Sequence, residues 1–148
     1  LRLSVRAYRP EVRTLLRERI TALAHAQAAT LGAEAVVDYR WRYPALVNDA
    51  ASTAFAREVA RDWLGEQALI PDLQPLTGSE DFSFMLEQCP GSYLIVGNGV
   101  GDTHGTGGCM VHNPGYDFND EILPIGASYW ATLVEQQLAR QAVPQAAE

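Results

Sequence analysis

The chain has 148 residues, of which 47% are hydrophobic, and its formal net charge at pH 7 is −7. This length fits one domain, and the apolar fraction is large enough to support a core. The acidic balance argues against nucleic acid as a partner, because binding phosphates requires a concentrated basic face.

The same composition bears on membranes and on the compartment. No stretch approaches the roughly 20 apolar residues that cross a bilayer, so no membrane partner is expected. The two cysteines, Cys89 and Cys109, are too few for a disulfide scaffold. Thiols of this kind are typical of a reducing compartment, and we expect a cytoplasmic protein.

Residues 1–42 predict a strand, a helix and a second strand. Apolar and polar side chains alternate over residues 1–8, which is the period of a half-buried strand. Pro10 suits the first position of a helix, and Gly32 suits its end. Alternation returns over residues 33–42. Because two strands and one helix make a thin core, we interpret this part as half of a small α+β domain whose other half precedes Leu1.

The pattern is interrupted at Tyr43 and Pro44, which we take as the crossing between two domains. Beyond it, Ser52 is expected to cap a helix that Gly65 ends. The predicted apolar face of this helix comprises Phe55, Ala56, Val59, Ala60, Trp63 and Leu64.

The C-terminal half predicts two more helices and a strand. Ser79 is expected to cap a helix with Phe82, Met85 and Leu86 turned inward. Residues 93–96 suggest a buried strand, and residues 97–108, which include His104, suggest a loop. Asn119 or Asp120 is expected to cap a final helix, and the tail from Gln141 to fray. The predicted apolar stripe of that helix comprises Leu123, Ala127, Trp130, Val134 and Leu138.

One histidine, His112, stands between a glycine-rich stretch and a densely polar turn in residues 107–120. A neutral imidazole on short, stiff backbone is a good ligand for first-row metals, and Asn113 and the nearby carboxylates could orient the ring. The alternative is a histidine that only completes a turn or fills a core position. On residue chemistry alone, both interpretations stay open.

Three segments occur in an order that resembles a known family: residues 77–84 (TGSEDFSF), 90–93 (PGSY) and 111–120 (VHNPGYDFND). Together they resemble the C-terminal part of an M20-type metal-dependent amidohydrolase, closest to the branch of hippurate hydrolases and N-acyl-amino-acid amidohydrolases. Residues 3–8 (LSVRAY) and 43–49 (YPALVND) are similar to the edges of that family's small lid domain.

The resemblance implies an α/β fold with a mixed α+β lid, in a two-domain zinc-peptidase-like architecture. Residues 1–43 would be the C-terminal strand-helix-strand half of the lid, or dimerisation, domain, and residues 44–148 the C-terminal part of the catalytic domain. The family's other metal ligands and its catalytic base match nothing in this chain. We therefore expect a C-terminal portion of a longer enzyme that is inactive by itself, and we assign no catalytic residue. The lid allows a homo-oligomer.

The activity implied is hydrolysis of the amide bond of a small N-acyl amino acid, such as hippurate, to a carboxylic acid and an amino acid. The implied cofactors are divalent metal ions, two in number (zinc, manganese, nickel or cobalt), with His112 as one ligand. Such a pair can lower the pKa of a shared water and polarise the amide carbonyl. The alternatives are an M20-type peptidase or deacylase acting on a related metabolite, and a noncatalytic truncated module.

Substrate-binding residues also follow from the resemblance. Arg6 occupies the place where related enzymes carry a lid arginine that reaches the substrate carboxylate, and a guanidinium fork suits that group. The alternative for Arg6 is a solvated surface arginine. Backbone N–H groups near Gly78 and Ser79 could receive a carboxylate or an oxyanion. The alternative for these two residues is a capped helix start.

Overall fold

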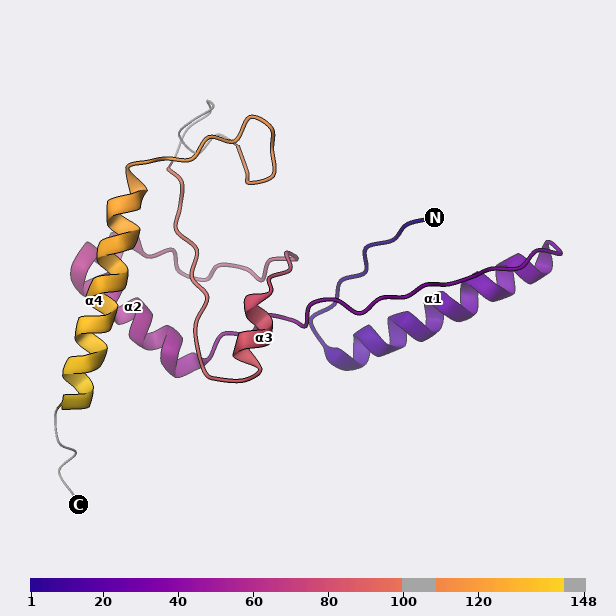
Figure 1. Cartoon of the computed structure of the whole chain (residues 1–148), viewed down its shortest axis with the longest axis horizontal. Coiled ribbons are helices and arrows are strands. Elements are labelled where there is room, and N and C mark those ends of the chain that lie inside the picture. Colours follow the sequence, from indigo (N-terminus) through magenta and orange to yellow (C-terminus); the bar gives the residue numbers. More distant parts are fainter. Residues whose placement is uncertain (100–108, 143–148) are drawn as a thin grey trace, which may run out of the picture. The chain divides into compact units, whose positions relative to one another are not determined.

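The structure is a computed structural model that describes residues 1–99 and 109–142. Its helices are α1 (Pro10–Thr30), α2 (Ala50–Leu64), the short 3₁₀ helix η1 (Glu66–Ala68), α3 (Phe82–Leu86) and α4 (Ile122–Ala142), as Figure 1 shows. The chain divides into two compact units. The first unit comprises Leu1–Asp49 and Asp72–Gly91, and the second comprises Ala50–Pro71 and Ser92–Glu148. The division into domains at residues 43 and 44 stays a prediction.

Helix α1 begins and ends where its sequence predicts. Pro10 occupies the start of the helix, where its missing N–H costs nothing, after Arg9 in extended conformation. At the other end Gly32 has a φ of +65°. The N–H of Gly32 donates to the carbonyl of Ala29, and the N–H of Ala33 donates to that of Ala28. These two bonds form a Schellman motif, which requires a left-handed residue at the glycine position.

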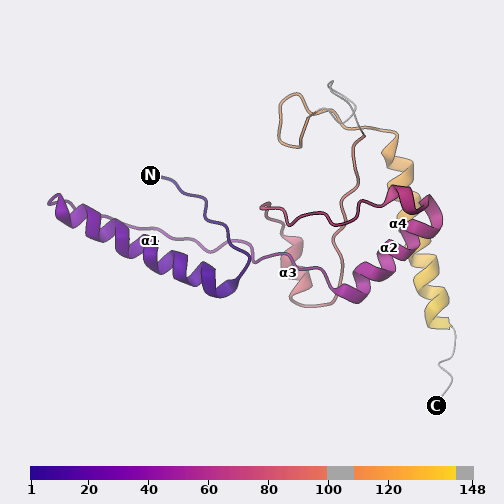
Figure 2. The ribbon, with the colours of Figure 1, turned by 180° about the vertical axis from the view of Figure 1, so that it is seen from behind.

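In the first unit, residues 33–42 turn back and run along α1, which both Figure 1 and Figure 2 show. Trp41 lies beneath two arginines of that helix, since the guanidinium carbons of Arg13 and Arg17 are 5.1 and 5.2 Å from its ring centroid. Tyr39 meets Trp41 edge to face. Cation–π and aromatic contacts of this kind hold the extended segment against the helix.

The predicted strands at residues 1–8, 33–42 and 93–96 are not present, and the part of the chain that the structure describes contains no strand. Residues 93–96 are exposed as well, contrary to the prediction that they are buried. The alternating pattern prescribes which side chains face one way, but a strand also needs a neighbour for its backbone hydrogen bonds. Among the described residues no such neighbour lies beside these segments, so the expected α/β fold appears here only through its helices.

The core of the second unit lies where α2 and α4 pack together. Ala56 and Val59 on α2 are buried, with Val59 completely inaccessible. Tyr129 on α4 donates a hydrogen bond to the carbonyl of Ala56. Near the other end of α4, Arg140 pairs with Glu58 over 2.7 Å and lies 4.4 Å from the ring centroid of Phe55. Burial supplies most of the attraction, and the polar contacts fix the alignment of the two helices.

Two predicted helix caps are wrong. Helix α2 begins at Ala50, so Ser52 lies inside the helix. Helix α3 begins at Phe82 with Asp81 at the cap position, so Ser79 lies outside the helix. Ser83 instead closes the first turn of α3, where its hydroxyl donates to the carbonyl of Glu80 over 2.6 Å. A serine hydroxyl can bond nearby backbone groups at many positions, so the presence of a serine does not fix the residue at which a helix begins.

The apolar stripe of α4 is largely exposed. Trp130, Val134 and Leu138 are exposed by 68%, 54% and 59%, and Leu123 by 57%. Tyr129 of the same helix contacts α2 through its hydrogen bond to Ala56. Apolar residues lie on both faces of this helix, so its periodicity does not select the packed one. Met85 of α3, which is predicted to point inward, is 58% exposed.

Candidate metal-ligand loop and substrate residues

His112 lies in a tight turn with an unusual backbone. The N–H of Asn113 donates to the carbonyl of Met110 over 3.2 Å, which makes His112 the third residue of a four-residue turn. Its φ is +69°, the sign that a type II turn requires at this position. Histidine is among the few residues besides glycine that are enriched in this region, which costs a side chain about 1–2 kcal/mol. The turn leaves His112 exposed.

A second turn follows immediately and is held by Asn113. The side-chain oxygen of Asn113 accepts a hydrogen bond from the N–H of Gly115 over 2.8 Å. Its main-chain carbonyl accepts another from the N–H of Tyr116 over 2.9 Å. Asparagine often bonds its own backbone in this way in turns. Asn113 is therefore a turn residue in this structure.

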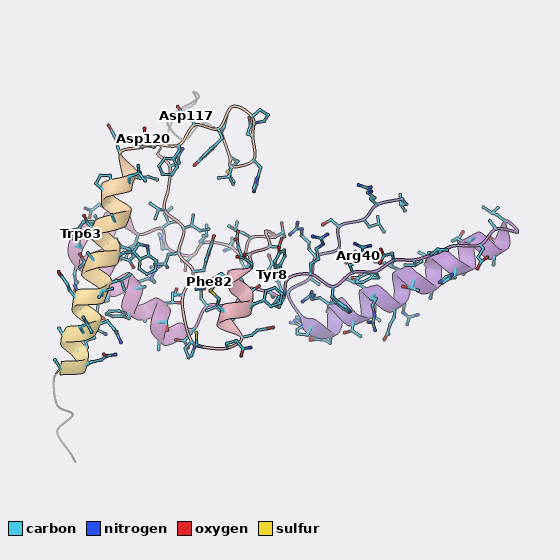
Figure 3. All side chains as sticks on the ribbon, in the orientation of Figure 1. Tyr8, Arg40, Trp63, Phe82, Asp117 and Asp120 are labelled. Carbon is cyan, nitrogen blue, oxygen red and sulfur yellow. The ribbon has the colours of Figure 1, made fainter. Side chains whose placement is uncertain are left out.

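The loop then reaches α4 through Asn119. The side-chain oxygen of Asn119 accepts a hydrogen bond from the N–H of Glu121 over 3.1 Å. This bond closes a turn that leads into α4, which begins at Ile122. Asn119 and Asp120, the two predicted caps, therefore precede the helix. Figure 3 shows Asp117 and Asp120 beside the start of α4. We call residues 110–119 the His112 loop. Its hydrogen-bonded turns make it a built segment of the second unit.

A metal site needs several ligating side chains close together. Residues 1–99 and 109–142 contain no group of three or more histidine, cysteine, aspartate or glutamate side chains that could hold a metal ion. Catalytic zinc sites use about three protein ligands. The described residues therefore do not form a complete metal site, and His112 fits only the role of one ligand among several. Its assignment as a metal ligand stays a prediction.

The three predicted substrate-binding residues lie in the first unit. Arg6 is exposed on the extended segment ahead of α1, and no ion pair within the described ranges involves it. Gly78 and Ser79 are exposed as well, and they precede α3 rather than forming its first turn. The idea that these N–H groups lie at a helix end is thus wrong. A role in contacting substrate stays a prediction for all three.

Gly78 has open space around it. A Cβ built on Gly78 would meet no heavy atom within 4 Å, and its φ lies outside the left-handed region. Packing within the described residues therefore does not require a glycine at this position.

Sequence reasoning missed Asn98, whose side chain makes two hydrogen bonds to the His112 loop. The only local signal is an asparagine between two glycines, Gly97 and Gly99, which is typical of any loop. The predicted loop of residues 97–108, with His104, lies mostly outside the described residues.

Comparison with known proteins identifies the family. Residues 6–136 match the model of peptidase family M20/M25/M40. This chain belongs to that family, and its relatives are hydrolases. The loop with His112 and the residues Arg6, Gly78 and Ser79 all lie within the matched range.

Several characterised relatives match over most of the chain. An IAA-amino acid hydrolase ILR1-like 4 of Arabidopsis thaliana is 34% identical over 127 residues, which are 83% of this chain and 28% of the relative. A hippurate hydrolase of Campylobacter jejuni is 31% identical over 138 residues, which are 93% of this chain and 34% of the relative. An N-acetyl-L-cysteine deacetylase of Bacillus subtilis is 32% identical, over 86% of the chain and 28% of the relative. The chain thus spans about a third of the length of these relatives.

Two further findings concern membrane-spanning helices and the two cysteines. None of the helices in the described part is both long and apolar enough to span a membrane. Of the two cysteines, Cys89 is exposed and Cys109 is half-buried.

Proposed function

We propose that this chain acts as the C-terminal part of a cytoplasmic M20 amidohydrolase that cleaves the amide bond of an N-acyl amino acid. Family membership supports the reaction class. The names of the three relatives support the substrate class, because they specify an IAA-amino acid, hippurate and N-acetyl-L-cysteine.

The His112 turn is the observation that carries the proposal. A side chain held at a φ of +69° is strained, and such strain persists where the surrounding structure and a function maintain it. Glycine would form the same turn without strain, so the turn alone gives no reason for an imidazole. We propose that His112 supplies one nitrogen ligand to a divalent metal pair, and that the remaining ligands and the proton-transferring base belong to other parts of the full-length protein.

We assign the substrate contacts to the first unit. Arg6 would bind the carboxylate of the amino-acid product half with a charge-assisted pair of hydrogen bonds. The exposed backbone at Gly78 and Ser79 would lie against the substrate. The predicted lid part, residues 1–43, would also contribute the surface through which the full-length protein forms a homo-oligomer.

The second candidate function is a deacylase or peptidase of the same family. The relative from Bacillus subtilis named as a deacetylase supports it, since its identity to this chain is similar to that of the hippurate hydrolase. Turnover of benzoylglycine, acetylated amino acids and dipeptides by the full-length protein separates the two. The amidohydrolase proposal expects the highest kcat/KM for an aroyl or arylacyl amino acid.

The test of the metal role uses His112→Asn and His112→Ala in the full-length protein. Asparagine tolerates the left-handed backbone, so His112→Asn keeps the turn while it removes the imidazole. We expect both variants to bind Zn²⁺ at least about 10- to 100-fold more weakly, because even indirect contacts to a metal have effects of that size. Equilibrium dialysis measures this affinity. His25→Ala, at an exposed histidine of α1, is the matched control and should bind Zn²⁺ normally.

Normal Zn²⁺ affinity and normal activity in His112→Asn would show that the imidazole is not a ligand. The histidine would then be a residue that only completes the turn, which is the alternative that the sequence left open.

A further inference from the structure

The side chain of Asn98 joins two stretches of backbone that are far apart in sequence. Its Nδ2 donates a hydrogen bond to the carbonyl of Asp117, and its Oδ1 accepts one from the N–H of Asn119, both over 2.8 Å. The partners are 19 and 21 residues away along the chain. Both distances are at the short end of ordinary N–H···O bonds, so the contact is well formed at each end.

This arrangement suits an amide. One end of the group must donate and the other must accept, and the short side chain of asparagine offers both on one planar amide. The amide thereby bonds a carbonyl and an N–H two residues apart, as a neighbouring strand would. The bond to Asn119 is partly shielded from water, which makes its loss costlier than that of an exposed contact.

The clamp continues into α4. The main-chain N–H of Asn119 donates to the side chain of Asn98. The side-chain oxygen of Asn119 accepts from the N–H of Glu121, in the turn that leads into α4. The end of the His112 loop is therefore tied to Asn98 on one side and to α4 on the other. The loop's beginning is closed by the turn from Met110 to Asn113, and its middle by the turn from Asn113 to Tyr116.

We propose that Asn98 is a positioning residue that holds the His112 loop in the place from which it presents the imidazole. This inference rests on the proposed function, since it assigns a task to His112, but the clamp itself is defined by contacts to backbone. Without Asn98, the two turns would keep their local bonds while the segment from Asp117 to Asn119 loses its anchor. His112 would then sample more positions, and metal binding would have to order the loop.

The experiment compares Asn98→Ala, Asn98→Asp and Gln67→Ala in the full-length protein. The control, Gln67, is also an amide that donates to a backbone carbonyl in the second unit, but its bond to Leu64 is local. Amide hydrogen exchange reports the clamp directly. In Asn98→Ala we expect the Asn119 N–H to exchange about 5- to 30-fold faster, the range for losing one to two ordinary hydrogen bonds. In Asn98→Asp, which keeps the acceptor, this N–H should stay protected.

Zn²⁺ affinity provides the second measurement. We expect Asn98→Ala to bind Zn²⁺ about 5- to 30-fold more weakly at a temperature well below its melting point, with Gln67→Ala unchanged. A purely structural asparagine would lower the melting temperature and leave this affinity alone.

Unchanged exchange across residues 110–119 in Asn98→Ala would overturn the proposal. So would faster exchange combined with normal Zn²⁺ affinity, in a protein where His112→Asn does lose Zn²⁺. If His112→Asn keeps its Zn²⁺, the proposed metal role fails instead, and the exchange data still decide whether Asn98 positions the loop.

Discussion

The phenol of Tyr129 on α4 donates a hydrogen bond to the main-chain carbonyl of Ala56 on α2 over 2.7 Å. This bond crosses the only core that the described part of the second unit contains, next to the buried Val59. Burial of the phenol raises the pKa of Tyr129 above its usual value near 10. The contact therefore links the packing of the two helices to pH.

Tyr129→Phe should lower the free energy of unfolding of the chain by about 0.5–1.5 kcal/mol at neutral pH, because a net hydrogen bond is lost. The pH dependence follows from the raised pKa. In the folded state the phenol stays protonated above pH 10, whereas in the unfolded state it ionises. The contribution of Tyr129 to the free energy of unfolding is therefore present below about pH 10 and is lost as pH rises through the folded pKa. As pH rises from about 9 to 11, the free energy of unfolding should therefore fall by less in Tyr129→Phe than in the parent.

Urea unfolding at a series of pH values measures this difference. Tyr8→Phe changes an exposed phenol in the first unit and is the matched control. An alkaline loss of stability as steep in Tyr129→Phe as in the parent would assign that loss to other groups.

Gly78→Ala should separate folding from substrate binding. A Cβ at this position meets nothing within 4 Å, so the melting temperature should not fall, and a small rise is expected because alanine restricts the unfolded chain. If substrate lies against this backbone, the methyl group should raise KM or lower kcat in the full-length enzyme. Kinetics and thermal unfolding of the same variant measure both. Unaltered kinetics with unaltered stability would remove Gly78 from the substrate surface.

Arg6→Ala in the full-length enzyme should weaken the use of substrates with a free carboxylate more than the use of their amides. Loss of a charge-assisted contact costs about 1.5–3 kcal/mol when water is excluded. This corresponds to about a 10- to 150-fold fall in kcat/KM for the acid. Steady-state kinetics on benzoylglycine and benzoylglycinamide provide the comparison, with Arg19→Ala, another exposed arginine of the first unit, as the control. An equal loss for the two substrates would make Arg6 a surface residue.

The 148-residue chain expressed alone should not hydrolyse benzoylglycine, with or without added Zn²⁺ or Mn²⁺. The physical reason is that no described group of side chains can hold a metal ion, and one imidazole cannot replace a full ligand set. Product formation followed by chromatography is the measurement. Turnover above roughly 1 s⁻¹, as in an ordinary enzyme, would place the active site within this chain.

Features that depend on a few neighbouring residues were predictable from the sequence. Pro10 and Gly32 bound α1 because one lacks an N–H and the other accepts a positive φ. Asn119 holds the turn ahead of α4 because its side chain reaches an N–H two residues away. The segments at residues 77–84, 90–93 and 111–120 resemble the family that residues 6–136 match.

Features that depend on distant partners were decided only by the tertiary structure. Residues 33–42 alternate apolar and polar side chains as a strand does, yet they lie along α1 and form no strand. A strand needs a neighbouring strand for its backbone hydrogen bonds. Helix α4 is apolar on two faces, and its contact with α2 at Tyr129 selects one of them. Asn98 looked like an ordinary loop residue because the groups that it binds, at Asp117 and Asn119, come close only when the chain folds. Local chemistry thus determined the two ends of α1, and long-range packing determined which side chains meet.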